Sequence, residues 1–93
     1  MKVKQDLNFG ENFKKLRYKN NLTQEDVVIK FQLYGINMTR SQYSQIELGR
    51  YNVNFTELLA LTDIFKCDYS DFFAGYSVDM LVKKSIGEEE NTK

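Results

Sequence analysis

Apolar residues recur every three or four positions in several stretches of this chain, and this spacing is the feature that most limits its fold. The first stretch places Phe9, Phe13 and Leu16 on one side of a helix, with Lys14 and Lys15 between them. The sequence contains no proline, the residue that most often interrupts a helix. We therefore predict an all-α fold, a compact bundle of about five helices.

Residues that favour helix N-termini precede the other apolar stretches. Thr23, Thr39, Asn54 and Ser70 can each accept a hydrogen bond from a free amide in the first turn of a helix. Asp26 follows Thr23 at the three-residue spacing of a capping box, in which two residues cap each other's amides. Four more helices are expected to begin after these caps.

The fourth expected helix is the most apolar of the set. Phe55, Leu58, Leu61 and Phe65 follow one stripe along it, which predicts that this helix forms the centre of the core. Residues 51–55 alternate between polar and apolar, as a strand would, but the stretch is short and lies between two capped helices. We interpret it as a loop.

Length and composition indicate one domain. We assign residues 1–76 to this domain and interpret 77–93 as a polar, partly disordered C-terminal extension in which 80–82 adds one apolar contact. The N-terminus has no apolar signal-peptide segment, and no window reaches the length of a membrane span. A cytoplasmic protein without a membrane partner is expected.

Composition excludes most catalytic and metal chemistry. The chain has no histidine and Cys67 is its only cysteine, so the usual zinc clusters, haem ligation and an internal disulfide lack their residues. A carboxylate-only metal site stays open. The commonest general base near neutral pH is missing, and no pair of acids has a spacing that suggests catalysis. We expect no enzyme activity, no catalytic residue, no bound metal and no cofactor.

The third expected helix, between Thr39 and Gly49, carries the most distinctive surface. Tyr43 and Ile46 lie one turn apart and face inward. The other positions are almost all hydrogen-bonding residues: Arg40, Ser41, Gln42, Ser44 and Gln45. In the major groove of DNA, arginine pairs with guanine, glutamine pairs with adenine, and serine adapts to either. The alternative is an ordinary solvated helix face, and the rest of the chain decides between the two interpretations.

Four spaced motifs carry a resemblance to a known family: LTQEDV at 22–27, RSQYSQIELGR at 40–50, LLAL at 58–61 and DFF at 71–73. Together they resemble the helix-turn-helix regulators of the Cro/cI/Xre type, the family of phage repressors, over roughly residues 9–74. The resemblance implies a lambda-repressor-like domain whose partner is double-stranded DNA.

The resemblance also implies roles for the polar residues of the third helix. Arg40, Ser41 and Gln45 match positions that reach the edges of bases. Gln42 and Ser44 match positions nearer the groove walls and the phosphates. Base contacts from the start of such a helix carry sequence specificity, whereas phosphate contacts set its position on the duplex.

Four residues outside that set also match family positions. Gln24 matches a glutamine that holds a backbone phosphate and can brace the recognition helix, and Arg50 matches a basic residue that meets a phosphate. Arg17 and Glu47 match a pair that joins the first helix to the end of the third. Such a pair is structural, because removing either partner leaves the other charge without compensation.

The connection between the second and third helices departs from the compact motif. The stretch 31–39 is roughly five residues longer than the usual three- or four-residue turn. Leu33, Tyr34, Ile36 and Met38 make this insert apolar enough to pack as an extra helical turn.

These features predict a transcriptional repressor that binds a palindromic operator as a homodimer, with half-sites about 34 Å apart. Aromatic and apolar residues near the C-terminus that stay exposed are expected to form the dimer surface, and they come from Tyr69, Phe72, Phe73, Tyr76 and Met80. The alternative is a protein-interaction module on the same scaffold, such as an antitoxin or antirepressor, whose partner is a toxin or another protein.

The zero net charge conceals an uneven distribution. Residues 1–50 carry 9 basic and 5 acidic residues, whereas 51–93 carry 4 and 8. The basic half contains the third helix, and the acidic half is expected to face away from DNA phosphates. Lys14, Lys15 and Lys19 belong to the basic half, but lysines on an exposed helix are usually only solvated, so we leave them out of the predicted site.

Overall fold

The structure is a computed structural model in which residues 9–77 are described, and the described part of the chain is all-α, as predicted. Its five helices are α1 (Gly10–Lys19), α2 (Gln24–Leu33), α3 (Arg40–Glu47), α4 (Phe55–Ile64) and α5 (Tyr69–Phe72). The expected apolar contact at 80–82 and the disorder expected in the C-terminal extension lie outside the described residues. Between 9 and 77, no helix is long and apolar enough to cross a membrane.

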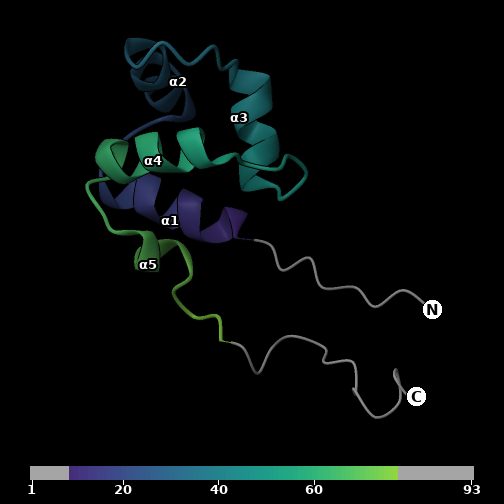
Figure 1. Ribbon diagram of the computed structural model, residues 1–93, viewed down its shortest axis with the longest axis vertical. Helices are drawn as coiled ribbons and strands as arrows, with labels where there is room; N and C mark the ends of the chain where they lie inside the picture. The colour runs from purple at the N-terminus through teal and green to yellow at the C-terminus, as the bar shows by residue number, and fades with distance from the viewer. Residues whose placement is uncertain (1–8, 78–93) are drawn as a thin grey trace, which may run out of the picture.

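The helices pack in a small bundle in which α2 and α3 form one end (Figure 1). The first helix, α1, packs against α3 and α5, and α2 packs against α3 and α4. The short α5 closes the other end of the bundle below α1 (Figure 1). This arrangement leaves the outer side of α3 uncovered by any other described helix.

Capping boxes start three of the helices, as the cap residues predicted. The Thr23 hydroxyl accepts the Asp26 N–H at 3.0 Å, and Thr39 and Asn54 cap α3 and α4 in the same way. The prediction that Ser70 caps the last helix is wrong. Asp68 precedes α5, and its N–H donates to the Asp71 carboxylate at 2.9 Å, so the helix starts one residue before Ser70.

The end of α3 is fixed by a Schellman motif, a pair of main-chain hydrogen bonds that closes a helix at a left-handed residue. Gly49 has φ of 77°, and its N–H donates to the Ile46 carbonyl at 3.0 Å. The Arg50 N–H donates to the Gln45 carbonyl at 2.9 Å. The main chain of Arg50 is therefore held against the last turn of α3.

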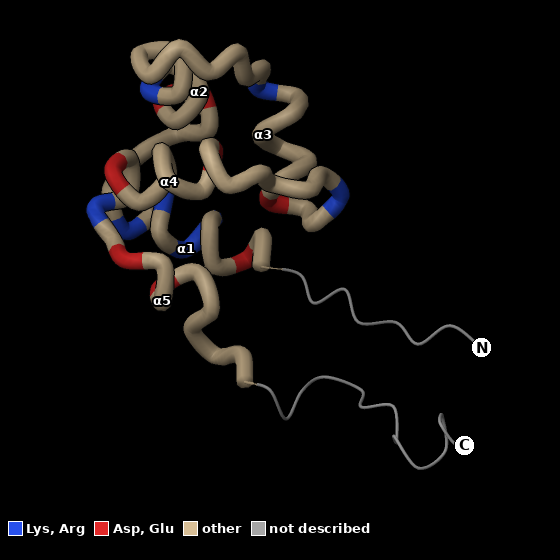
Figure 2. Tube along the Cα trace, viewed as in Figure 1, with Lys and Arg blue, Asp and Glu red and all other residues tan. Residues whose placement is uncertain are grey.

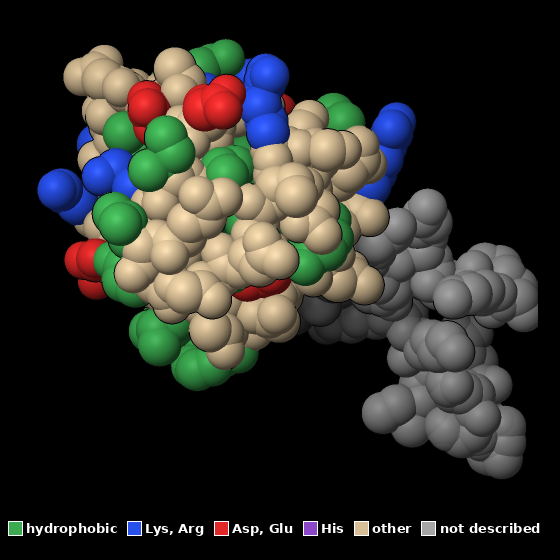
Figure 3. Space-filling model, turned by 90° about the horizontal axis from the view of Figure 1, so that it is seen from above, with side chains coloured by type: hydrophobic (Ala, Val, Ile, Leu, Met, Phe, Trp, Pro, Cys, Tyr) green, Lys and Arg blue, Asp and Glu red, His purple; other side chains and the backbone are tan. Residues whose placement is uncertain are grey.

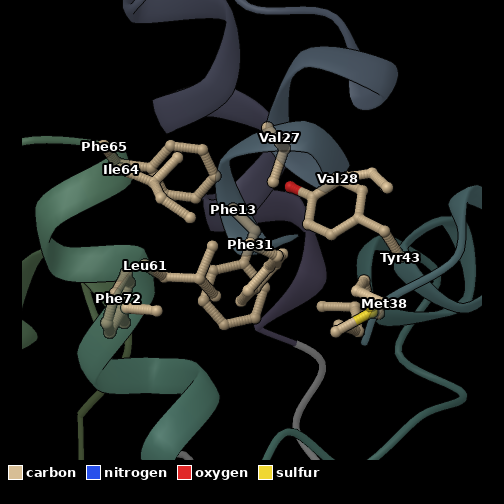
Figure 4. Close-up of a cluster of buried hydrophobic side chains, with 12 residues drawn as sticks. Phe13, Val27, Val28, Phe31, Met38, Tyr43, Leu61, Ile64, Phe65 and Phe72 are labelled. Atoms are coloured by element: carbon tan, nitrogen blue, oxygen red, sulfur yellow. The ribbon is translucent and has the colours of Figure 1, made fainter. Parts of the chain in front are cut away.

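Twelve buried apolar side chains from all five helices and the α2–α3 connection form one core (Figure 4). Phe13, Phe31 and Leu61 are at its centre, and Phe72 closes it from α5. The predicted α4 stripe is partly wrong, because Phe55 is 68% exposed. The buried side of α4 instead follows Glu57, Leu61 and Ile64 at helical spacing, which places Phe55 on the opposite side.

The connection between α2 and α3 is shorter than predicted and is not an extra helical turn. Because α2 continues to Leu33, only six residues, 34–39, separate it from Arg40. Gly35 ends α2 with φ of 77°. Met38 is buried in the core, whereas Leu33 is 80% exposed. Met38 in the core and the partly buried Ile36 packed against it therefore hold the connection to the bundle.

Candidate nucleic-acid interface

The buried apolar side of α3 sets the orientation of this helix and leaves its polar side at the surface. Tyr43 and Ile46 are almost completely buried in the core, at 0% and 1% exposure. Around them, Arg40, Ser41 and Gln42 are exposed and Ser44 and Gln45 are half-buried. Core packing thus fixes which side of the helix faces outward, so that its hydrogen-bonding groups are held ready for an external partner.

Five of the candidate residues gather around one hollow of about 330 Å³ at the surface. Its lining consists of Gln24, Arg40, Ser41, Ser44 and Gln45. The first of these begins α2 and the others belong to the first two turns of α3. The structure therefore brings the start of α2 and the start of α3 together, although 16 positions separate Gln24 from Arg40 (40 − 24).

Two candidate residues lie apart from this hollow. The Gln42 side-chain oxygen accepts the Thr39 N–H at 3.0 Å, so it belongs to the cap of α3. Arg50 is exposed just past the opposite end of the eight-residue α3, a helix about 12 Å long. Basic positions therefore lie near both ends of α3, with Arg40 as its first residue and Arg50 three residues past its last, and Figure 2 shows blue segments in both places.

A buried ion pair joins α1 to the end of α3. Arg17 Nε donates to Glu47 Oε2 at 2.7 Å and Arg17 Nη2 donates to Oε1 at 3.1 Å. Both residues are only 7% exposed. A third donor, Arg17 Nη1, reaches the Leu22 carbonyl at 3.1 Å and connects the pair to the loop before α2. The pair therefore joins α1, α2 and α3 at one point.

Gln24 connects this ion pair to the hollow. Its Nε2 donates to Glu47 Oε1 at 3.0 Å, which fixes the amide at the start of α2. An amide nitrogen carries a second N–H, so the same group can still donate to an external acceptor. The side chain that lines the hollow is therefore held in place by the buried pair behind it.

Glu47 is ionised in this setting. Burial alone would raise the pKa of its carboxyl, but the hydrogen bonds from Arg17 and Gln24 and the charge of Arg17 outweigh burial and hold the pKa below its ordinary value. The hydrogen bond to Glu47 likewise raises the pKa of Arg17, against the effect of burial. Both partners therefore stay charged at neutral pH.

Gly10 is a residue that sequence reasoning missed. It starts α1 where that helix crosses the last turn of α3, and it is buried. A methyl group added there would overlap the Glu47 carbonyl and lie 2.7 Å from the Ile46 carbonyl oxygen. The available signal was a glycine in the first turn of a predicted helix, where glycine has no helix-forming advantage.

The end of the molecule that carries α2 and the start of α3 is mostly polar. Figure 3 shows this end from above, with hydrophobic side chains in small separate groups and basic and acidic side chains among them. Within residues 9–77, no group of histidine, cysteine, aspartate or glutamate side chains is placed to hold a metal ion. The chemistry that the exposed start of α3 offers, through Arg40, Ser41 and Gln42, is therefore hydrogen bonding and charge.

The fold and this polar helix define a DNA-binding regulator of the helix-turn-helix class. A family model described as a helix-turn-helix domain matches residues 10–78, and the chain belongs to this family. It is a Cro/Xre-type transcriptional regulator.

A solved structure shows the same architecture. The chain is similar to the restriction-modification controller protein C.AhdI from Aeromonas hydrophila, with 27% sequence identity and a TM-score of 0.60. The similarity covers 71% of this chain and 92% of the controller chain. No protein with a curated description matches the chain.

Proposed function

We propose that this protein is a sequence-specific repressor that acts in the cytoplasm and binds a palindromic operator as a homodimer. The hollow lined by the start of α2 and the start of α3 is the observation that carries the proposal. It combines one arginine with serines and glutamines, the side chains that recognise base edges in the major groove. The protein would repress by occupying its operator and excluding other proteins from the same DNA.

Direct readout of bases falls to Arg40, Ser41 and Gln45. Arg40 and Ser41 are the first two residues of α3 and are exposed, in the part of a recognition helix that reaches deepest into the groove. Gln45 lies one turn further along and lines the same hollow.

The remaining candidate residues position the helix on the backbone. Gln24 donates its second amide N–H to a phosphate, and Arg50 meets another phosphate beyond the other end of α3. Ser44 and Gln42 face the groove wall, where Gln42 uses its amide N–H groups because its oxygen caps α3. Contacts of this kind orient the domain without selecting a sequence.

An exposed apolar surface on α4 and α5 supports the homodimer. Phe55 and Leu59 are one turn apart on α4, with exposures of 68% and 51%, and Tyr69 and Phe73 have the same spacing near α5, with 38% and 46%. The rings of Phe55 and Tyr69 stack at 6.2 Å between centroids and join the two pairs. Apolar surface of this kind marks interaction sites, and a second copy would cover it. The similarity to a restriction-modification controller further supports a controlling role.

Replacing Arg40 with alanine should weaken binding to the preferred operator by about 1–3 kcal/mol and relax selectivity at one base pair. The reason is the loss of bidentate pairing with guanine, which contributes only when the correct base is present. Gel-shift titrations against the operator and its single-base variants measure both effects.

Lys30→Ala, on α2, serves as the control, because Lys30 is basic but does not line the hollow. It should leave the order of preference among the variants unchanged. If Arg40→Ala keeps the wild-type order of preference at every position, then Arg40 does not read a base.

A further inference from the structure

A second, larger depression continues the proposed interface onto α1. It has a volume of about 530 Å³ and shares Gln24, Arg40 and Ser44 with the first hollow. On its other side it is lined by α1 residues that include Lys14 and Tyr18. The polar surface at the start of α2 and α3 is therefore continuous with one side of α1.

The three lysines of α1 are not equivalent in this arrangement. Lys14 is half-buried and lines the depression, whereas Lys15 and Lys19 are exposed and do not line it. The Lys14 ammonium lies 5.9 Å from the centre of the Tyr18 ring, and the Arg17 guanidinium lies 4.6 Å from the same ring. Cation–π contacts of this kind hold the Lys14 and Tyr18 side chains in place at the edge of the depression.

The charges of the depression favour an anion. Three cationic side chains and two carboxylates line it. Arg17 and Glu47 neutralise each other in the buried pair. The remaining charges of the lining are two positive, on Lys14 and Arg40, and one negative, on Glu11. The phenolic hydroxyl of Tyr18, whose side chain is 59% exposed, adds a hydrogen-bond donor.

We propose that Lys14 and Tyr18 bind a phosphate of the DNA backbone, so that the interface extends from α2 and α3 onto α1. This inference rests on the proposed function, because the DNA that enters the first hollow also supplies the phosphate. A lysine binds phosphate as a point charge, and it carries no base information there. Lys14 and Tyr18 therefore contribute to affinity and register, and the start of α3 contributes selectivity.

Replacing Lys14 with alanine tests this assignment, with Lys15→Ala as the matched control on the same helix. Lys14→Ala should weaken binding by the same factor on the operator and on all its variants. It should also reduce the slope of log affinity against log salt by about 0.9 per protomer, the value for one lost phosphate contact. Lys15→Ala should change neither quantity.

Two further variants separate the contribution of the Tyr18 hydroxyl from that of the charges around Lys14. Tyr18→Phe removes only the hydroxyl, so it should weaken binding uniformly and leave the salt slope unchanged. Glu11→Gln removes the carboxylate that lines the same depression one helical turn before Lys14, and it should strengthen binding. All of these positions except Lys14, which is half-buried, are exposed, and equal thermal melting curves will show that each variant is folded.

Two results would overturn the inference while leaving the proposed function intact. One is an equal salt slope for Lys14→Ala and Lys15→Ala, with Arg40→Ala still losing selectivity. The other is a Lys14→Ala loss confined to one base pair, which would make Lys14 a base contact. If the wild-type chain shows no salt-dependent binding to duplex DNA, both the inference and the proposed function fail.

Discussion

Replacing Glu47 with alanine is expected to lower the free energy of unfolding by about 3–5 kcal/mol, because it leaves the buried Arg17 guanidinium without its partner. Arg17 is only 7% exposed, so water cannot take the place of the carboxylate without opening the fold. The same substitution removes the acceptor that holds Gln24. Base preference should change little, because neither Arg17 nor Glu47 lines the hollow at the start of α3. Chemical denaturation followed by circular dichroism measures the loss.

Glu25→Ala is the matched control, since Glu25 is an exposed glutamate in the first turn of α2 and its replacement should cost no more than about 1 kcal/mol.

The lowered pKa of Glu47 predicts a pH dependence of stability that tests the same ion pair. Its stabilising effect is present above the ordinary glutamate pKa and disappears as the pH falls through its lower folded value, so Glu47→Gln should flatten that part of the stability curve. Unchanged melting of Glu47→Ala with altered sequence selectivity would contradict the structural role.

Gly10→Ala is expected to destabilise the fold by about 3 kcal/mol, near the upper part of the range for overpacking, because main chain rather than a flexible side chain must move. The added methyl group would overlap the Glu47 carbonyl at the crossing of α1 and α3. Helix propensity alone favours alanine over glycine, so the expected sign is the opposite of the propensity effect. Thermal and chemical denaturation measure the change.

Lys15→Ala introduces the same residue on the exposed side of α1 and should stay within about 0.5 kcal/mol of the wild type. A Gly10→Ala protein as stable as Lys15→Ala would show that α1 and α3 can separate at no cost. The close approach of these helices at Gly10 would then have no role in setting the position of α3.

Local chemistry made the helix starts predictable. Thr23, Thr39 and Asn54 each have a residue three positions later whose main-chain N–H they accept, and these contacts depend on a few adjacent residues only. The burial of Tyr43 and Ile46 followed from their spacing for the same reason. Arg17 and Glu47 are 30 positions apart, so their contact could be anticipated only from the family resemblance.

Features that depend on how helices cross were not predictable from periodicity. Phe55 belongs to an apolar sequence, but the side of α4 that faces the core is set by α2, and Phe55 lies on the other side. The role of Gly10 depends on a carbonyl of another helix. Lys14 and Lys15 are adjacent in sequence, and the packing of α1 against α3 places only Lys14 in the lining of the larger depression.

Selection of bound sequences from a random pool of duplex DNA tests the central claim most directly, because the protein itself picks out its operator from the pool. The wild-type protein should enrich one motif with two-fold symmetry and half-sites about 34 Å, one helical turn, apart. Arg40→Ala should return a motif that is degenerate at one base pair of each half-site. A wild-type selection that enriches no motif would contradict sequence-specific binding and favour a module whose main partner is another protein.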